Sequence, residues 1–341
     1  MSKERVKTLR AGIGTLLAVG GAICIVTVMP AAAQNAALPL AGILGPDSKI
    51  AFHGDREGRD SPDEIYVMSA DGSGERRVTP TTDACNAINP RWSPNGHRIA
   101  FHCFTDAPPF SEIYLIDADG TGMTQLTNMT PAGLGAAFAS WSPKGNKIAF
   151  NSPRTPNIYV VDVDEGVVTQ LTSRGGRRPD WSPDGRKLVF HNGPLTAFQI
   201  FVADIDNPDV AVQLTFTGAN MNARWSPDGS RITFESNRDG NREIYVMNAD
   251  GSAQFRLTTN TVRDEVPSFS PDGQWIVFHR QLRTDQGMLP NGSDLFAVRV
   301  DPPREEVRLT TRADDPAKPP SFSSFASWAF GVLRPAERAE R

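Results

Sequence analysis

The most informative stretch of this 341-residue chain is Trp225-Ser226-Pro227-Asp228-Gly229, followed by Ile232-Thr233-Phe234. Pro stands at the second and Gly at the fourth position of the Ser-Pro-Asp-Gly segment, which is the arrangement that a type I turn favours sterically. Strand-like apolar residues lie on either side of this turn. The stretch therefore predicts two antiparallel strands joined by a tight turn.

The same pattern recurs along the chain. Six apolar strands end in Phe, at Phe52, Phe101, Phe150, Phe190, Phe234 and Phe278. Successive Phe positions are 49, 49, 40, 44 and 44 residues apart. The turn that precedes these strands begins with Trp-Ser-Pro at Trp92, Trp141, Trp181 and Trp225, with Phe269-Ser270-Pro271 in a fifth copy. A period of 40 to 50 residues is typical of a repeat architecture.

Each copy contains two further strands. A strand with a central aromatic residue follows the Phe strand, as in Glu243-Ile244-Tyr245-Val246-Met247, and a short strand ending in Thr closes the copy, as in Leu257-Thr258. We name the four strands of a copy A (Trp), B (Phe), C (Tyr or Phe) and D (Thr). Four-stranded units of this length are typical of propeller blades.

We therefore predict an all-β fold over residues 44–333, a six-bladed β-propeller with four antiparallel strands per blade. A blade cannot bury both faces alone, so the six copies must stack around an axis. The first copy lacks its own Trp strand, whereas Ser327-Trp328 near the C-terminus matches Ser140-Trp141. We predict that residues near 325–330 complete blade 1 and close the ring, which removes exposed sheet edges.

The N-terminus has the pattern of a secretory signal. Four basic residues precede an apolar run over residues 11–29, and Ala31-Ala32-Ala33 forms an A-x-A cleavage site. We predict a signal peptide over residues 1–33 cleaved after Ala33, a short segment 34–43, and a charged tail 334–341. A retained membrane anchor is the alternative, because the run is long enough to span a bilayer. Cleavage would leave a periplasmic or secreted protein without a membrane span, which we expect to be a monomer.

Export bears on charge and on cysteine chemistry. Loss of four Lys/Arg and one Glu with the signal peptide changes the formal net charge from −4 to −7, so nucleic acid is not expected as a partner. Cys85 and Cys103 remain, in a compartment where disulfides persist. The turn between them brings Cys85 within one residue of facing Cys103. We predict a structural disulfide, the alternative being a reactive thiol or metal pair.

The segments Trp225-Ser226-Pro227-Asp228-Gly229 and Asn248-Ala249-Asp250-Gly251 resemble the WD40-like (PD40) repeat of the TolB family. The resemblance extends over about residues 44–330. It implies a periplasmic propeller that docks other envelope proteins on one end of the ring, as TolB binds the Pal lipoprotein. TolB proteins also carry an N-terminal α/β domain, which we do not expect here because about ten residues separate Ala33 from the first blade.

Motifs of common enzymes are missing from the sequence. It contains no G-x-S-x-G elbow, no H-E-x-x-H, no P-loop and no dinucleotide-binding G-x-G-x-x-G. We therefore expect a non-catalytic scaffold that binds a protein or peptide in the bacterial envelope, without a cofactor. The alternative is a carbohydrate-active or other hydrolytic or lyase propeller that uses loop residues on the face with the variable loops.

Four histidines occupy one repeat position, directly after the Phe of strand B: His53, His102, His191 and His279. Asn151 and Glu235 take this position in the other two copies. Such a ring suggests a metal, but strand B lies about 4.8 Å further from the axis than strand A, whereas Zn²⁺ ligands lie about 2 Å from the ion. We predict hydrogen bonding within or between blades and no metal site. The Asp-Gly turns at Asp71, Asp119 and Asp250 faintly resemble calcium loops but lack the distal bidentate Glu, so we interpret them as turns.

Candidate binding residues lie just before the Trp positions, close to the mouth of the axial channel. They are Arg91, Arg178, Arg224, Asp180, Asp264 and Glu265. If the three arginines gather around the axis, they favour an acidic peptide or carboxylate ligand. The alternative is that they pair with the three acidic residues across neighbouring blades. We expect binding at the end of the ring that carries the B–C and D–A loops, since these loops vary most.

Overall fold

The computed structural model describes residues 48–54, 62–80, 85–104, 111–284, 287–310 and 324–329. The predicted signal peptide, the segment 34–43 and the tail 334–341 lie outside these residues. Within the described part of the chain, no helix has the length and apolar character needed to cross a membrane.

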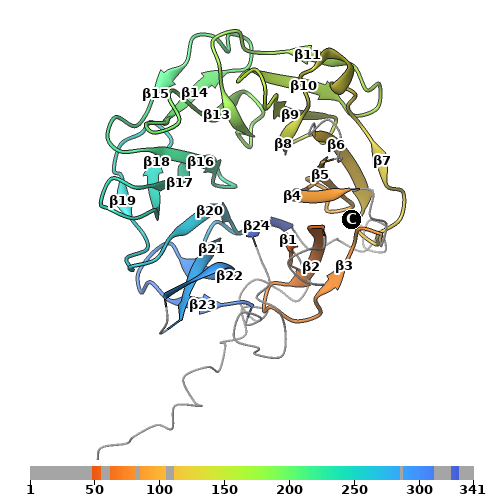
Figure 1. The fold of residues 1–341 in the computed structure, drawn as a ribbon. Helices are drawn as coiled ribbons and strands as arrows, with labels where there is room; N and C mark the ends of the chain where they lie inside the picture. Colours follow the sequence, from red (N-terminus) through yellow and green to blue (C-terminus); the bar gives the residue numbers. More distant parts are fainter. Residues whose placement is uncertain are drawn as a thin grey trace, which may run out of the picture. The chain divides into compact units, whose positions relative to one another are not determined.

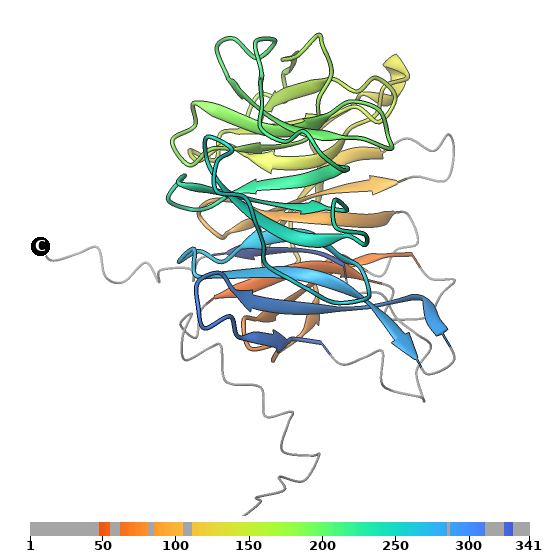
Figure 2. The same cartoon turned by 90° about the vertical axis from the view of Figure 1, so that its left-hand side faces the viewer.

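The described strands form six four-stranded antiparallel sheets around a common axis (Figures 1 and 2). Blade 1 contains β24 (Ser324–Ala329), β1 (Lys49–Gly54), β2 (Glu64–Ser69) and β3 (Arg76–Arg77). Blade 2 contains β4 (Asn86–Trp92), β5 (Arg98–Phe104), β6 (Ser111–Asp117) and β7 (Thr124–Gln125). Blade 3 contains β8 (Ala137–Trp141), β9 (Lys147–Asn151), β10 (Ile158–Asp162) and β11 (Val168–Gln170).

The remaining blades follow the same order from the axis outward. Blade 4 contains β12 (Arg177–Trp181), β13 (Lys187–Asn192), β14 (Gln199–Asp204) and β15 (Val212–Gln213). Blade 5 contains β16 (Asn220–Trp225), β17 (Arg231–Ser236), β18 (Glu243–Asn248) and β19 (Phe255–Arg256). Blade 6 contains β20 (Asp264–Phe269), β21 (Trp275–Thr284), β22 (Gly287–Arg299) and β23 (Glu306–Arg308). The predicted strands A to D are thus confirmed.

Blade 1 is assembled from both ends of the propeller sequence. Strand β24 pairs antiparallel with β1, and Trp328 lies opposite Ile50 in the register. This is the pairing that Trp92 and Ile99 make in blade 2. The predicted closure by a C-terminal strand is therefore confirmed.

The aromatic residues of strands B and C form the core of each blade. The six Phe residues of strand B are 0 to 3% exposed. Each stacks on the aromatic residue of strand C in the same blade, as Phe234 does on Tyr245 with ring centroids 5.6 Å apart. Burial of each Phe stabilises the fold by roughly 1.5–3 kcal/mol, and the stacking adds about 0.5–1.5 kcal/mol. This contact explains why both positions stay aromatic in all six copies.

The Thr at the end of each copy compensates for the shortness of strand D. Strand D has only two or three residues, so the first apolar residue of strand C has no strand D carbonyl beside its N–H. In blade 5 the Ile244 N–H donates instead to Thr258 Oγ1 (3.0 Å), and the Thr258 hydroxyl donates to Glu243 (2.6 Å). The corresponding Thr accepts such a bond in all six blades.

The Asp-Gly turns pack against the preceding blade. Gly120 has φ +97°, and a Cβ atom there would lie 2.9 Å from the carbonyl oxygen of Val78. Asp119 Oδ1 accepts bonds from the N–H and hydroxyl of Thr121 (2.9 and 2.7 Å), and these bonds lower the pKa of Asp119. The carboxylate therefore shapes the turn, which agrees with our interpretation of these segments.

Blades 2 and 6 each have one further feature. Cys85 and Cys103 are joined by a disulfide with a Cα–Cα distance of 5.3 Å, as predicted. Strands β21 and β22 have 10 and 13 residues, and their hairpin extends beyond the neighbouring blades in Figure 2.

We expect truncation before Ser324 to unfold the propeller cooperatively, because it leaves the inner edge of β1 unpaired and opens the ring. A chain ending at residue 323 should melt at a lower temperature, still in a single transition, in circular dichroism. A chain ending at residue 333 is the matched control and should melt like the full protein. Equal melting of both truncated chains would contradict the closing role of β24.

Candidate binding site in the axial channel

The inner strands of blades 2 to 6 each contain a bulge three residues before the Trp or Phe. The residue in the bulge has a left-handed backbone although none is Gly: Asn89 (φ 56°), Phe138 (61°), Arg178 (51°), Asn222 (56°) and Val266 (55°). This conformation costs L-residues roughly 1–2 kcal/mol each. Five equivalent positions with the same cost indicate a compensating contact at each one.

That contact is made by the residue after the Phe of strand B. The N–H of each left-handed residue donates to the side chain of the residue that follows the strand B Phe in the preceding blade. The five bonds are Asn89 to His53 Nδ1 (3.2 Å), Phe138 to His102 Nδ1 (3.3 Å), Arg178 to Asn151 Oδ1 (2.8 Å), Asn222 to His191 Nδ1 (3.5 Å) and Val266 to Glu235 Oε2 (2.8 Å). Three of the four histidines thus connect neighbouring blades, and His279 bonds Glu265 of its own blade, which confirms the predicted hydrogen bonding within or between blades. Among the described residues, no group of three or more His, Cys, Asp or Glu side chains could hold a metal ion.

These histidines must be neutral to accept through Nδ1. Burial, with a smaller contribution from the positive charge of Arg178, lowers the pKa of His102 to about 3. Burial likewise holds the pKa values of His53 and His191 well below their usual range. The inter-blade bonds therefore remain intact through the neutral and mildly acidic range.

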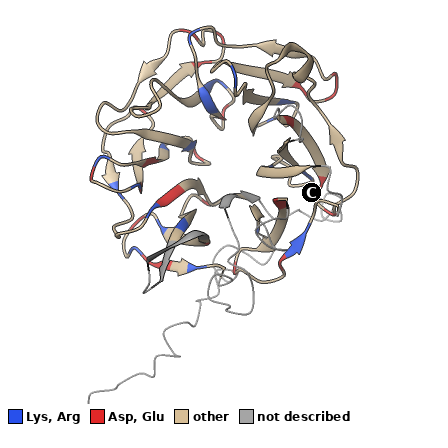
Figure 3. Cartoon of the chain, in the orientation of Figure 1, with Lys and Arg blue, Asp and Glu red and all other residues tan. Residues whose placement is uncertain are grey.

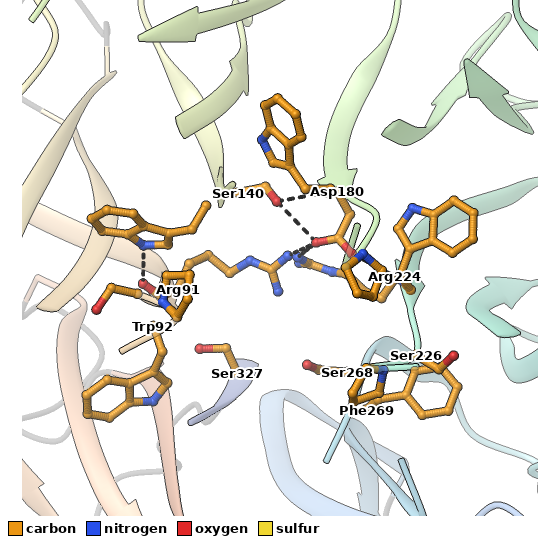
Figure 4. Close-up of a pocket in the computed structure, with 16 residues that line it drawn as sticks. Arg91, Trp92, Ser140, Asp180, Arg224, Ser226, Ser268, Phe269 and Ser327 are labelled. Atoms are coloured by element: carbon orange, nitrogen blue, oxygen red, sulfur yellow. Dashed lines mark hydrogen bonds and ion pairs between the residues drawn. The ribbon is translucent and has the colours of Figure 1, made fainter. Parts of the chain in front are cut away.

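The left-handed residues and their bonds to the preceding blade form a first layer around the channel. A second layer is formed by the residues directly before the Trp or Phe of strand A. In ring order from blade 2 they are Arg91, Ser140, Asp180, Arg224, Ser268 and, in blade 1, Ser327. Figure 4 shows Arg91 and Arg224 converging on Asp180, with Ser268 and Ser327 on the other side of the opening. All six blades contribute one side chain to this layer.

Asp180 is the centre of the cluster. Its Oδ1 lies 2.5 Å from Arg91 Nη2 and 3.3 Å from Arg224 Nη1, and its Oδ2 accepts the Trp225 N–H at 3.0 Å. Burial raises the pKa of Asp180, and the charge of Arg91 opposes that rise. Because the three charged residues come from blades 2, 4 and 5, the cluster also ties these blades together across the channel.

The other predicted binding residues, Arg178, Asp264 and Glu265, lie outside the Asp180 cluster. The Arg178 guanidinium lies 3.9 Å from the centroid of the Phe138 ring, and burial lowers its pKa to about 10. Asp264 is fully buried and pairs with Arg280 of its own blade at 2.7 Å. Figure 3 shows basic residues at the start of β12 and acidic residues at the start of β20, both on the inner side of the ring.

Glu265 belongs to another small network. It pairs with Arg242 Nη1 at 2.6 Å and with His279 Nε2 at 3.2 Å, and these partners hold its pKa near 2 against the effect of burial. The pairing alternative is therefore correct for Arg91 and Arg224 with Asp180. Asp264 instead forms its ion pair with Arg280 of strand B, and Glu265 with Arg242 of the segment before strand C and with His279.

A cavity of about 290 Å³ opens in the second layer. Its walls are aromatic and proline side chains: Trp92, Trp141, Trp181, Trp225, Phe269, Pro94, Pro183 and Pro227. The prolines belong to the A–B turns, so this cavity lies toward that end of the ring and not at the end with the B–C and D–A loops, where we expected binding. The three serines of the layer were missed by the sequence analysis, although they share the repeat position of Arg91, Asp180 and Arg224.

The strands and the channel define a closed six-bladed β-propeller with an axial pocket. The TolB beta propeller domain family (PD40) matches residues 81–215 and 178–287, which together make up more than half of the sequence. The chain belongs to this TolB propeller family.

Individual relatives match over shorter stretches. An uncharacterised protein of Agrobacterium fabrum is 32% identical over 149 residues, which are 42% of this chain and 48% of that protein. A TolB homolog of Chlorobium chlorochromatii is 33% identical over 145 residues, 42% of this chain and 31% of that protein. The matched stretches thus span half or less of these relatives.

The solved structures agree with the family in fold. TolB from Acinetobacter baumannii superposes with a TM-score of 0.67 at 22% identity, covering 85% of this chain and 68% of that one. This likeness establishes the shared propeller architecture.

We expect His102→Asn to make stability less sensitive to acid. Asn can accept the Phe138 N–H as Asn151 accepts the Arg178 N–H, but it cannot bind a proton. In the wild type, His102 is neutral when folded and protonated when unfolded between pH 6.5 and about 3, so folding stability falls as the pH is lowered through this window. The variant should lose about 1 kcal/mol less per pH unit in urea unfolding from pH 6 to 4. The surface variant His97→Asn should keep the wild-type slope, and an unchanged slope in His102→Asn would refute this role.

We expect Asp180→Asn to destabilise the propeller by about 2–3 kcal/mol, because two largely buried guanidinium groups lose their counter-charge. Chemical denaturation at neutral pH measures this effect. Asp206→Asn, on an exposed turn of the same blade, is the control and should change stability by less than about 0.5 kcal/mol. Similar stability of the two variants would show that the ion cluster is not needed for the ring.

Proposed function

We propose that this protein is an exported, non-catalytic scaffold that binds a protein or peptide of the bacterial envelope in its axial channel. The observation that carries the proposal is the Arg91–Asp180–Arg224 cluster beside a cavity that all six blades build. Ligand sites typically combine such apolar walls with a few converging polar groups. A rigid ring would hold these groups in place without further ordering on binding.

The acidic residues near the axis favour binding over hydrolysis. A general acid or base must be free to exchange a proton with the substrate. Glu235 is fully buried and accepts from Asn222 Nδ2 and the Val266 N–H, while Asp180 and Glu265 are held by arginines. Each of these carboxylates is thus engaged in holding blades together.

The family supports the same proposal. The TolB resemblance implies a periplasmic propeller that docks envelope proteins, and the N-terminal residues have the pattern of a secretory signal. Both are compatible with a disulfide between Cys85 and Cys103, since disulfides persist in oxidising compartments.

Co-purification from envelope extract tests the proposal. We expect the full protein to retain a specific partner that an Arg91→Gln/Arg224→Gln variant loses, because both cations facing the cavity are removed. The matched control is Arg186→Gln/Lys187→Gln, which removes two exposed charges at the same end of the ring but outside the cavity.

The control should retain the partner, and both variants should be checked for wild-type circular dichroism before comparison. If the cavity variant melts too early, Arg224→Gln alone is used, since Arg91 then keeps its shorter contact with Asp180. An identical set of partners for the cavity and control variants would refute binding in the channel.

A further inference from the structure

The axial cluster has more positive than negative charge. Two guanidinium groups meet one carboxylate, so the second layer carries a net charge of +1. The side chains of Arg91, Asp180 and Arg224 are 13, 14 and 17% exposed, so solvent screens this charge only weakly. An anion in the cavity would neutralise it.

Hydrogen-bond donors of the cluster remain unused. Arg91 donates through Nε to the Ala139 carbonyl and through Nη2 to Asp180, and Arg224 donates through Nη1 to Asp180. Within the described residues, Nη1 of Arg91 and both Nε and Nη2 of Arg224 have no acceptor. Both residues line the cavity, so these N–H groups are available to a bound molecule.

A neutral donor completes the opposite wall. Ser327 lines the cavity and is only 3% exposed, and its hydroxyl has no hydrogen-bond partner in the part of the chain that the structure describes. A buried hydroxyl without a partner destabilises the fold unless a ligand or water satisfies it. Figure 4 shows Ser327 across the opening from Arg91 and Arg224.

We infer that this cavity is a subsite for one carboxylate group of a peptide, held by Arg91 and Arg224 with Ser327 on the far wall. The inference rests on the proposed function, a peptide-binding role for the channel. Arginine pairs with carboxylates through short charge-assisted bonds, and the tryptophan walls suit the apolar part of the residue that carries the carboxylate. The site lies at the end of the ring that carries the A–B turns.

Charge and size select this ligand class. One carboxylate balances the net charge of +1, whereas a phosphate monoester carries about −1.5 to −2 at neutral pH and would overcompensate it. The volume of about 290 Å³ is at the lower limit of ligand pockets. It accommodates a single side chain or chain terminus, so the remainder of a partner would stay outside.

Tryptophan fluorescence of the full protein provides the test, because four indoles line the cavity. Three N-acetylated peptides serve as probes. The first is acetyl-Gly-Ser-Gly-Glu-Gly-Ser-amide, with one side-chain carboxylate. The second has Gln in place of Glu and a free C-terminal carboxylate, and the third has Gln and a C-terminal amide, so it is uncharged. Inorganic phosphate is the fourth probe.

We expect saturable binding of the first or the second peptide, and the one that binds identifies the source of the carboxylate. Arg224→Gln should weaken this binding at least tenfold, and Arg186→Gln/Lys187→Gln should leave it unchanged. Ser327→Ala removes no hydrogen bond of the described residues, so it should keep the wild-type melting temperature and weaken binding about threefold.

Binding of the uncharged peptide as tight as that of the charged ones, binding of phosphate alone, or no binding of either carboxylate would overturn the inference. If the carboxylate peptides fail but the envelope partner is still lost in Arg91→Gln/Arg224→Gln, the proposed function stands and the ligand class is wrong. If the partner is retained as well, both are wrong.

Discussion

In blades 2 to 6, a backbone N–H of the inner strand, turned toward the preceding blade by a bulge, holds neighbouring blades together at the axis. Sheets stacked only through apolar faces could slide, because hydrophobic contact has no preferred direction. The bond from Phe138 N–H to His102 and its four equivalents fix blades 1 to 6 against one another in sequence. The left-handed backbone is required for this bond, and it occurs at Val266 although β-branched residues rarely adopt it. The repeat position after the Phe is polar for the same reason.

The axial layers follow from this constraint. Once the bulge has turned the left-handed residue toward the neighbour, the residue two positions later points into the channel, where six polar side chains meet. The positive charges of Arg91 and Arg224 would repel each other across the channel. Asp180 lies between them and pairs with both, which reduces this repulsion. The same arrangement leaves one positive charge over. Stability and the proposed recognition thus draw on the same residues, and we expect a change at Asp180 to affect both.

Much of the fold could be predicted from the sequence, because each repeated residue makes one repeated contact. The Phe of strand B, the aromatic residue of strand C and the Thr of strand D recur six times, and Trp328 showed which strand completes blade 1. The site was predictable only in part. Arg91, Asp180 and Arg224 share a repeat position, but residue type gave no sign of the bulge, since Phe138 and Val266 rarely adopt a left-handed backbone. The bulge is what separates Arg178 from the cluster. The partners of Asp264 and Glu265 could not be predicted, because Arg280 and Arg242 fall outside the repeat motif.

The shared construction of blade 1 also bears on when the protein can fold. Strand β1 begins at residue 49, but its inner partner β24 begins at residue 324, so the first blade to be synthesised is the last to be completed. Pairing of strands so far apart in the sequence requires closure of a long loop, and the entropy lost in that step slows folding of the whole ring. Under the export that we propose, this delay would keep the chain unfolded while it crosses a membrane. The sequence order itself keeps the polypeptide open until its C-terminal end has been made.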